Sequence, residues 1–245
     1  MKHQRQSLAI AIASALALPA LSLSSLTQAE GLYVSAQVGI SQQINESEAY
    51  GNNIAIDPDF PSEFDTGDGN VGAISLGYSF NKNLRIEGRI AYRDTSFNDR
   101  QVGTGERAGE EYILNGEFKS TTFTVEGFYD FANSTAFTPY VKAGLGIADN
   151  TYTARLGGAG VAGFDPFDGK TDGYYDAYAD DDSTELSWNL GAGANIAVSE
   201  RVSIYGEYQY ASFGDVSTGQ DSFTDGFKID NASANELSLG LRFEF

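Results

Sequence analysis

The sequence predicts an all-β fold: an eight-stranded antiparallel up-and-down transmembrane β-barrel with short periplasmic turns and four long extracellular loops. Apolar side chains occupy every second position in eight segments, the links between those segments alternate between short and long, and the first residues have the features of an export signal. Period-two alternation is typical of a strand with two unlike faces. Short turns that alternate with long loops are typical of barrels in outer membranes.

The amino-terminal segment predicts export. A basic start, MKHQRQS, is followed by the apolar run LAIAIASALALPALSL and the small-residue exit LTQA. This order of regions is that of a secretory signal peptide, residues 1–29, with cleavage after Ala29. The alternative is a membrane anchor, for which the apolar run is short. Residues 30–245 then form a single barrel domain outside the cytoplasm.

The first four predicted strands are residues 31–41, 70–80, 84–94 and 120–131. In each of them the residues between the apolar positions are mostly polar or small. The apolar positions are, strand by strand, Leu32, Val34, Ala36, Val38 and Ile40; Ile74, Leu76, Tyr78 and Phe80; Leu84, Ile86, Ile90 and Tyr92; and Phe123, Val125, Tyr129 and Phe131. Each segment therefore has one apolar and one polar face.

The last four predicted strands are residues 140–148, 185–198, 201–211 and 235–245. Their apolar positions are Val141, Ala143, Leu145 and Ile147; Leu186, Trp188, Leu190 and Ile196; Val202, Ile204, Tyr208 and Tyr210; and Leu237, Leu239, Leu241, Phe243 and Phe245. The final strand thus carries five large apolar residues on one face up to the carboxy terminus. Such a face either packs on a protein core or faces lipid.

The links between the strands alternate in length. Three are short (NKN, ANSTAFT and SER), and the four long, polar links are roughly residues 42–69, 98–115, 156–183 and 215–232. Aromatic residues gather at the strand ends beside the short links, where an aromatic girdle of a membrane barrel is expected. These residues are Tyr78, Phe80, Tyr129, Phe131, Phe137, Tyr140, Phe243 and Phe245.

This combination resembles the small eight-stranded outer-membrane β-barrel family, of the outer membrane protein A transmembrane domain and opacity-protein kind. The resemblance covers nearly all of residues 30–245 and rests on the export signal, the eight alternating segments, the rhythm of the links and the terminal Phe245. It implies a place in the outer membrane of a Gram-negative bacterium, contact with outer-membrane lipid and lipopolysaccharide, and insertion by the barrel-assembly machinery, which reads the last strand. A soluble lipocalin-like or sandwich protein is the alternative and would turn its apolar faces inward.

The family also implies an expectation about the end of the chain. Proteins of the outer membrane protein A kind often add a peptidoglycan-binding domain after the eighth strand. This sequence ends with that strand, so we expect the opacity-like branch of the family.

If the apolar faces meet lipid, the charged faces point into the barrel lumen. Six of these residues lie at similar depth, three acids and three bases: Glu87, Arg89, Glu126, Lys142, Glu207 and Arg242. Buried charges are tolerated when they are paired, and eight strands leave an interior that side chains can fill. We expect a salt-bridge plug. A gated, narrow ion path whose charges exchange partners is the alternative.

Composition excludes several kinds of chemistry. Removing residues 1–29 removes the only histidine, and the chain has no cysteine. A His-based triad, a Cys nucleophile and an ordinary zinc site are therefore excluded. The remaining 13 basic and 34 acidic residues give a formal charge of −21, which makes nucleic acid an unsuitable partner. We expect no enzyme activity and no cofactor, although a carboxylate pair can in principle act as acid and base.

The third long link is rich in aspartate and could bind hard cations, which need only oxygen ligands. Its spacing differs from that of an EF-hand, and the alternative is a solvated acidic loop. The residues of this possible weak Ca²⁺ or Mg²⁺ site are Asp165, Asp168, Asp172, Asp176, Asp180, Asp181 and Asp182.

The predicted function follows from the loops, because recognition usually lies in loops on a rigid scaffold. Their aromatic residues either contact an extracellular ligand or pack the loops on one another. They are Tyr50, Phe60, Phe64, Tyr112, Phe164, Phe167, Tyr174, Tyr175, Tyr178, Phe223 and Phe227. We predict a noncatalytic surface protein with a structural or surface-interaction role, the alternative being a narrow, porin-like small-solute or ion channel.

Overall fold

The computed structural model describes residues 31–50, 57–160, 174–178, 181–219 and 226–245. Within these ranges the chain is almost entirely antiparallel strand, with one 3₁₀ turn at Gly105–Arg107. The strands are β1 (Leu32–Gln43), β2 (Ser47–Tyr50), β3 (Glu63–Phe64), β4 (Asp68–Ser79), β5 (Leu84–Val102), β6 (Glu111–Asp130), β7 (Phe137–Ala159), β8 (Tyr174–Ala177), β9 (Asp181–Ala197), β10 (Val202–Ser217) and β11 (Gly226–Glu244). Among the described residues, no helix is long and apolar enough to cross a membrane.

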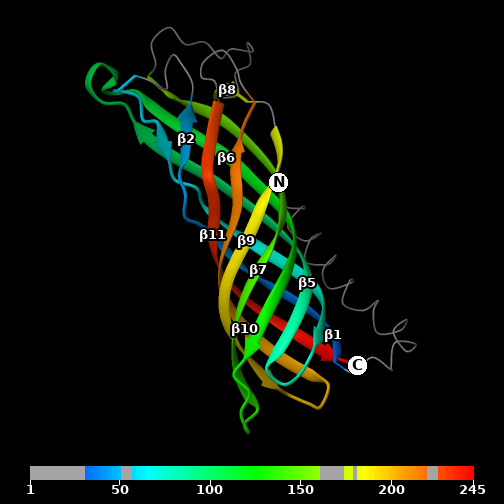
Figure 1. Cartoon of the computed structure of the whole chain (residues 1–245). Helices are drawn as coiled ribbons and strands as arrows, with labels where there is room; N and C mark the ends of the chain where they lie inside the picture. The colour runs from blue at the N-terminus through cyan, green and yellow to red at the C-terminus, as the bar shows by residue number, and fades with distance from the viewer. Residues whose placement is uncertain (1–30, 51–56, 161–173, 179–180, 220–225) are drawn as a thin grey trace, which may run out of the picture.

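Eight of the strands close into a barrel. Their order is β1-β4-β5-β6-β7-β9-β10-β11, and β1 pairs with β11 to complete the ring. The three short strands pair with strands of the barrel or with one another: β2 pairs with β11, β3 pairs with β2, and β8 pairs with β7. The long tilted arrows of Figure 1 run from the end with the short turns and the C-terminus to the end where β2 and β8 lie. This is the predicted up-and-down topology.

The outer face of the barrel is apolar from the short-turn end to about the middle of each long strand. Large apolar side chains are exposed there on all eight strands; Leu239 is 67% exposed and Leu186 is 62% exposed. On β5 this region runs from Leu84 to Tyr92. Nine tilted residues cover roughly 20–25 Å of membrane normal, the height of the apolar band of an outer-membrane barrel.

Aromatic residues border the short-turn end of the apolar band. Three of the strands that descend to this end finish with T-shaped pairs whose ring centroids are 5.2–5.5 Å apart: Tyr78 with Phe80, Tyr129 with Phe131 and Phe243 with Phe245. The assignment of Tyr140 to this girdle was wrong. Tyr140 is 2% exposed because it has the parity opposite to Val141 and points into the lumen.

Above the apolar band the two faces of each long strand exchange their character. On β5 the exposed residues change from Leu84, Ile86 and Ile90 to Ser96 and Asn98. The buried residues change in the opposite sense, from arginine and glutamate to Phe97. The same reversal occurs on β6 and β7. The strands therefore continue beyond the membrane as a structure with an apolar interior and a polar surface.

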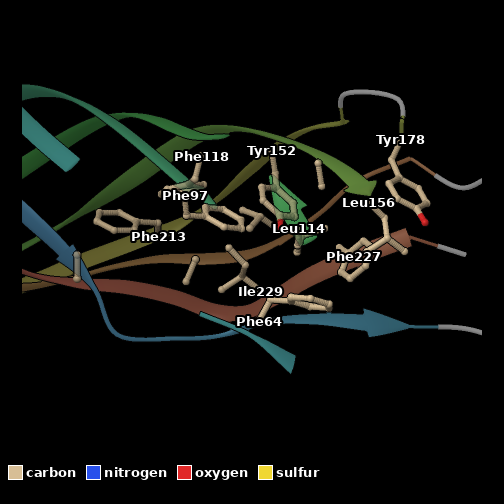
Figure 2. Close-up of a cluster of buried hydrophobic side chains, with 14 of the residues drawn as sticks. Phe64, Phe97, Leu114, Phe118, Tyr152, Leu156, Tyr178, Phe213, Phe227 and Ile229 are labelled. Atoms are coloured by element: carbon tan, nitrogen blue, oxygen red, sulfur yellow. The ribbon is translucent and has the colours of Figure 1, made fainter. Parts of the chain in front are cut away.

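This outer part is two sheets rather than a closed barrel. The β4–β5 ladder ends at Gly69↔Thr95, and the β9–β10 ladder ends at Trp188↔Ser212, while β5, β9 and β10 continue. One sheet is formed by β5, β6, β7, β8 and the first residues of β9, and the other by β10, β11, β2 and β3. Figure 2 shows aromatic side chains filling the space between them. We call this part the outer sandwich.

The predicted loop boundaries need correction in consequence. Much of the four segments expected as long loops is strand; in the second, only residues 103–110 lie between β5 and β6. The prediction ended each strand where its outward face ceased to be apolar. In water a strand buries its apolar face inside the protein. At that point the apolar residues therefore move from the outward to the inward face, and the strand continues.

The reversal predicts opposite tolerance to charge at two outward-facing positions. Leu239→Arg places a charge in the middle of the apolar band and should lower the free energy of unfolding by about 2–4 kcal/mol. Ser96→Arg, the matched control in the outer sandwich, should change it by less than about 0.5 kcal/mol. Denaturant titration of the protein folded in lipid vesicles measures both. Equal effects at the two positions would contradict the membrane boundary drawn here.

Candidate functional site

Four charged side chains from four strands meet in the lumen and are called the charge network. They are Arg89 on β5, Glu126 on β6, Lys142 on β7 and Glu207 on β10. Lys142 Nζ lies 3.0 Å from Glu126 Oε2 and 2.7 Å from Glu207 Oε1. Arg89 Nη1 lies 3.2 Å from Glu126 Oε1 and 3.9 Å from Glu207 Oε1. Each base thus faces both acids, and all four residues are buried.

Glycines in the neighbouring strands make room for these long side chains. A Cβ atom on Gly144 would lie 2.9 Å from Glu126 Cγ and 2.8 Å from Asn189 Nδ2. A Cβ atom on Gly191 would lie 3.2 Å from Lys142 Cε. The pattern of inward glycines on β7 and β9 therefore allows charges from opposite walls to cross the lumen and meet.

Neutral polar groups complete the hydrogen bonding of the two acids. The Asn189 amide donates to Glu126 Oε1 over 2.9 Å. The Tyr140 hydroxyl donates to Glu207 Oε2 over 2.9 Å. These bonds hold the carboxylates in place between the two bases and reduce the cost of burying them.

A second group, the mouth cluster, lies nearer the short-turn end. Arg85 Nη1 is 2.8 Å from Glu87 Oε1, and Arg85 Nε is 2.8 Å from Asp130 Oδ2. The Tyr33 hydroxyl donates to the same Glu87 oxygen over 2.8 Å. The Arg85 guanidinium also lies 3.8 Å from the centroid of the Phe128 ring, a cation–π contact.

Arg242 lies at the rim of this cluster. Its Nη2 is 3.0 Å from Glu244 Oε1, and the side chains are 14% and 44% exposed respectively. The Arg242 guanidinium is 5.4 Å from the centre of the Tyr33 ring. It therefore pairs with an acid at the rim.

A third charged pair, Arg93 with Glu236, lies at the upper end of the lumen. Thr122 accepts a hydrogen bond of 2.9 Å from Arg93. Gln209 joins this pair to the charge network, because it accepts from Arg89 over 3.0 Å and donates to Glu236.

The structure divides the six predicted lumen residues. It brings Arg89, Glu126, Lys142 and Glu207 together, and it places Glu87 with Arg85 and Arg242 with Glu244. Several partners were not singled out: Tyr33, Arg93, Asp130, Asn189, Gln209 and Glu236. Counting the inward parity of each strand further would have found Arg93 and Glu236, because they lie four residues beyond Arg89 and six before Arg242.

Above the upper pair, the interior becomes apolar. The Arg93 guanidinium lies 4.7 Å from the centre of the Phe213 ring, which begins the buried cluster of the outer sandwich. We call this cluster the aromatic core; its large members are Phe60, Phe64, Phe97, Tyr112, Leu114, Phe118, Tyr152, Leu156, Tyr178, Phe213, Phe227 and Ile229. Phe60, Phe64, Tyr112, Tyr178 and Phe227 were among the loop aromatics, and their burial supports packing rather than ligand contact.

A polar latch closes one seam of the outer sandwich. Arg107 donates to Asp57 over 2.8 Å and to Tyr112 over 2.9 Å. Asp59 accepts from the Glu106 amide over 2.9 Å. The amide of Asp59 and the guanidinium of Arg107 together lower the pKa of Asp57. Residues 57–60 are thereby fixed to the turn between β5 and β6.

The aspartates of the possible cation site fall mostly outside the described residues. Asp165, Asp168, Asp172 and Asp180 are not described, and of Asp176 only the backbone is. Asp182 accepts a hydrogen bond of 2.7 Å from Thr151, and Asp181 lies 3.4 Å from the Ser217 hydroxyl. In the described part of the chain, no three His, Cys, Asp or Glu side chains gather as metal ligands do.

The chain is similar to outer-membrane proteins in both sequence and structure. A sequence model of the outer membrane protein beta-barrel domain matches residues 13–245. The outer membrane protein PagN of Salmonella typhimurium is 27% identical over 193 residues, 71% of this chain and 72% of PagN. The crystal structure of OprG from Pseudomonas aeruginosa is 16% identical, with a TM-score of 0.53 over 88% of this chain and 97% of OprG. Neisserial surface protein A is 19% identical, with a TM-score of 0.45 over 88% of this chain and 98% of its own.

The charge network predicts a rescue between two substitutions. Lys142→Met removes the base closest to both acids and leaves two buried carboxylates with Arg89 alone, which should cost about 3 kcal/mol of unfolding free energy. Adding Glu207→Gln restores the balance of charge and should recover at least half of that loss. Chemical denaturation in lipid vesicles measures both changes.

The control is Lys119→Met, because Lys119 forms an exposed pair with Glu117. That change should cost less than about 1 kcal/mol. If the double variant were as unstable as the sum of its single substitutions, the two residues would not be coupled.

Proposed function

The chain belongs to the outer membrane protein beta-barrel domain family, and on that premise we propose that it is a noncatalytic surface protein. Its place is the outer membrane of a Gram-negative bacterium. In this proposal residues 1–29 are a signal peptide that is removed on export, and residues 30–245 are one domain. The barrel anchors the protein in the membrane, and the outer sandwich presents the connecting segments to the exterior.

The observation that carries the proposal is the reversal of polarity along the long strands. It supports a rigid platform above the membrane, because the outer sandwich has its own aromatic core and a polar outer surface. The described connection between β5 and β6, residues 103–110, lies at the far end of that platform. Segments on a rigid scaffold at a cell surface are well placed for contact with external partners.

The packing of the lumen supports an anchor more than a channel. The charge network, the mouth cluster and the upper pair cross the lumen, and the aromatic core fills the space above them. The cavity beside Glu87 and Arg242 has a volume of about 10 Å³, close to what one water needs. A solute would have to displace both the charged groups of the lumen and the aromatic core to cross the barrel.

The surface charge constrains the proposed partner. In the described part of the outer sandwich, the basic residues Arg100, Arg107, Lys119 and Lys228 each have a carboxylate within 4 Å. Acidic residues outnumber basic residues in this part of the chain. This favours a cationic partner, or lipopolysaccharide phosphates bridged by divalent cations, over a free polyanion. Insertion by the barrel-assembly machinery belongs to the same proposal.

The absence of histidine and cysteine from residues 30–245 supports a noncatalytic role. The acids of the lumen that could act in proton transfer are held by arginine, lysine, tyrosine or asparagine. They lie inside the barrel. A substrate could reach such acids in an open cleft, but these are not in one.

Conductance of the refolded protein in a planar bilayer tests the closed barrel. We expect no stable conductance steps, because both layers of side chains obstruct the lumen. Migration that changes on heating verifies in the same sample that the barrel is folded. Steady single-channel steps from that folded sample would overturn the proposal in favour of the channel.

The platform role predicts a local effect of core truncation. Phe227→Ala removes a fully buried ring that packs 5.7 Å from Phe64 and 5.3 Å from Tyr178. It should destabilise the outer sandwich by about 3 kcal/mol and increase the rate of proteolysis there, while the membrane part stays folded. Limited proteolysis with mass mapping measures this. Phe243→Ala on the lipid-facing surface is the control, and equal cleavage in both variants would contradict the role assigned to the core.

A further inference from the structure

The lumen contains many buried polar atoms that have no hydrogen-bond partner in the protein. In the lower lumen these atoms are Gln37 Nε2, Arg89 Nε and Nη2, Asp130 Oδ1, Asn189 Oδ1, Asn195 Nδ2 and Arg242 Nε. Near the upper pair they are Gln43 Nε2 and Oε1, Thr95 Oγ1, Ser120 Oγ and Asn150 Oδ1. A buried polar group without a partner costs about 1–3 kcal/mol, so this number of them in one lumen requires an explanation.

These atoms follow the lumen and stop at the aromatic core. Asn195 pairs in register with Tyr205, and Tyr205 lies two residues from Ser203, the register partner of Arg242. Asn195 is therefore close to the short-turn end. Ser120 pairs with Arg93 on one side and with Asn150 on the other, at the level of the upper pair. Thr95 and Gln43 lie one inward position further out, in register with Phe118 and Ala234 at the lower edge of the aromatic core. In the described part of the outer sandwich beyond these two residues, no further such atom occurs.

Water is the ligand that fits this arrangement. The unpartnered atoms include both donors and acceptors, and a buried water typically forms about three hydrogen bonds to such groups. Three of the donors, on Gln37, Asn195 and Arg242, face one small cavity. Its volume of about 10 Å³ is about the size needed for one water.

The two ends of the lumen differ in their access to solvent. The side chain of Glu126 is 1% exposed, that of Arg242 is 14% exposed and that of Glu244 is 44% exposed, so exposure rises toward the short-turn end. At the other end Phe118 is 1% exposed and Phe213 is fully buried. Polar side chains continue to a partly exposed rim at the short-turn end, whereas apolar side chains close the lumen toward the exterior.

We propose that the lumen is a hydrated, blind compartment: ordered waters enter from the short-turn end and bind the unpartnered polar groups, and the aromatic core is the seal toward the exterior. This inference rests on the proposed closed barrel. It assigns the seal to the aromatic core rather than to the charge network. The charge network then lies on the wet side of the barrier. Its charges are stabilised by water as well as by one another.

Four side-chain amides provide the test in the unmodified protein. Gln37, Gln43 and Asn195 have unpartnered amide atoms, whereas both polar atoms of the equally buried Gln209 have protein partners. Magnetisation transfer from water to side-chain amide protons, measured by NMR on the refolded barrel, should give cross-peaks for the first three and none for Gln209. Absence of cross-peaks for all four would mean a dry lumen and overturn the proposal, while leaving the surface role intact.

The side from which water enters is tested with a stopper added after folding. Ser79 lies at the short-turn end, is partly exposed and has inward parity, and the chain has no cysteine. Ser79→Cys, folded first and then alkylated with N-ethylmaleimide, should slow the exchange of the Gln37 and Gln43 amide protons with bulk water. Ser96→Cys, alkylated in the same way on the outer surface, should leave exchange unchanged. Slowing by the outer adduct, or by neither, would overturn the direction of entry.

Discussion

The fold depends on one constraint: each long strand passes through two solvents. In the membrane the outward face has to be apolar, and in water the inward face has to be. One sequence meets both demands because alternate side chains point to opposite faces, so the apolar residues change parity where the membrane ends. On β5 this occurs between Tyr92 and Phe97. The closed barrel and the two-sheet outer sandwich are the structures that the two halves of this pattern specify.

The constraint also determines what fills the interior. Below the boundary the inward positions carry arginine, lysine and glutamate, which reach across the lumen over inward glycines such as Gly144. Above it, rings such as Phe118 and Phe213 pack 5.8 Å apart between two sheets. Buried charges require charged partners or water, whereas closely packed rings exclude both charged groups and water. The lower interior is therefore suited to hydration and the upper interior to sealing.

The barrel and its eight strands could be predicted from period-two alternation, and so could the inward direction of six charged residues, four of which meet in the charge network. The strands were predicted to end too early, because the prediction followed a single apolar face: Phe97 lay beyond the predicted strand 84–94, and Leu114 lay in the predicted loop 98–115. It placed Tyr140 in the girdle because it counted aromatic residues near a turn without their parity. Which charges meet could not be read from depth alone: Glu87 and Arg89 share a strand, yet Glu87 contacts Arg85 and Arg89 contacts Glu126.

The measurement that tests the change of solvent most directly is a residue-by-residue map of contacts with lipid acyl chains, by solid-state NMR of the protein in lipid bilayers. We expect acyl-chain contacts along the outward face of β5 through Ile90 and Tyr92 that end at Asp94, with the same limit at Phe123 on β6 and Ile147 on β7. Acyl-chain contacts that continue to Ser96 and Asn98 would contradict this expectation. They would place the outer sandwich inside the membrane.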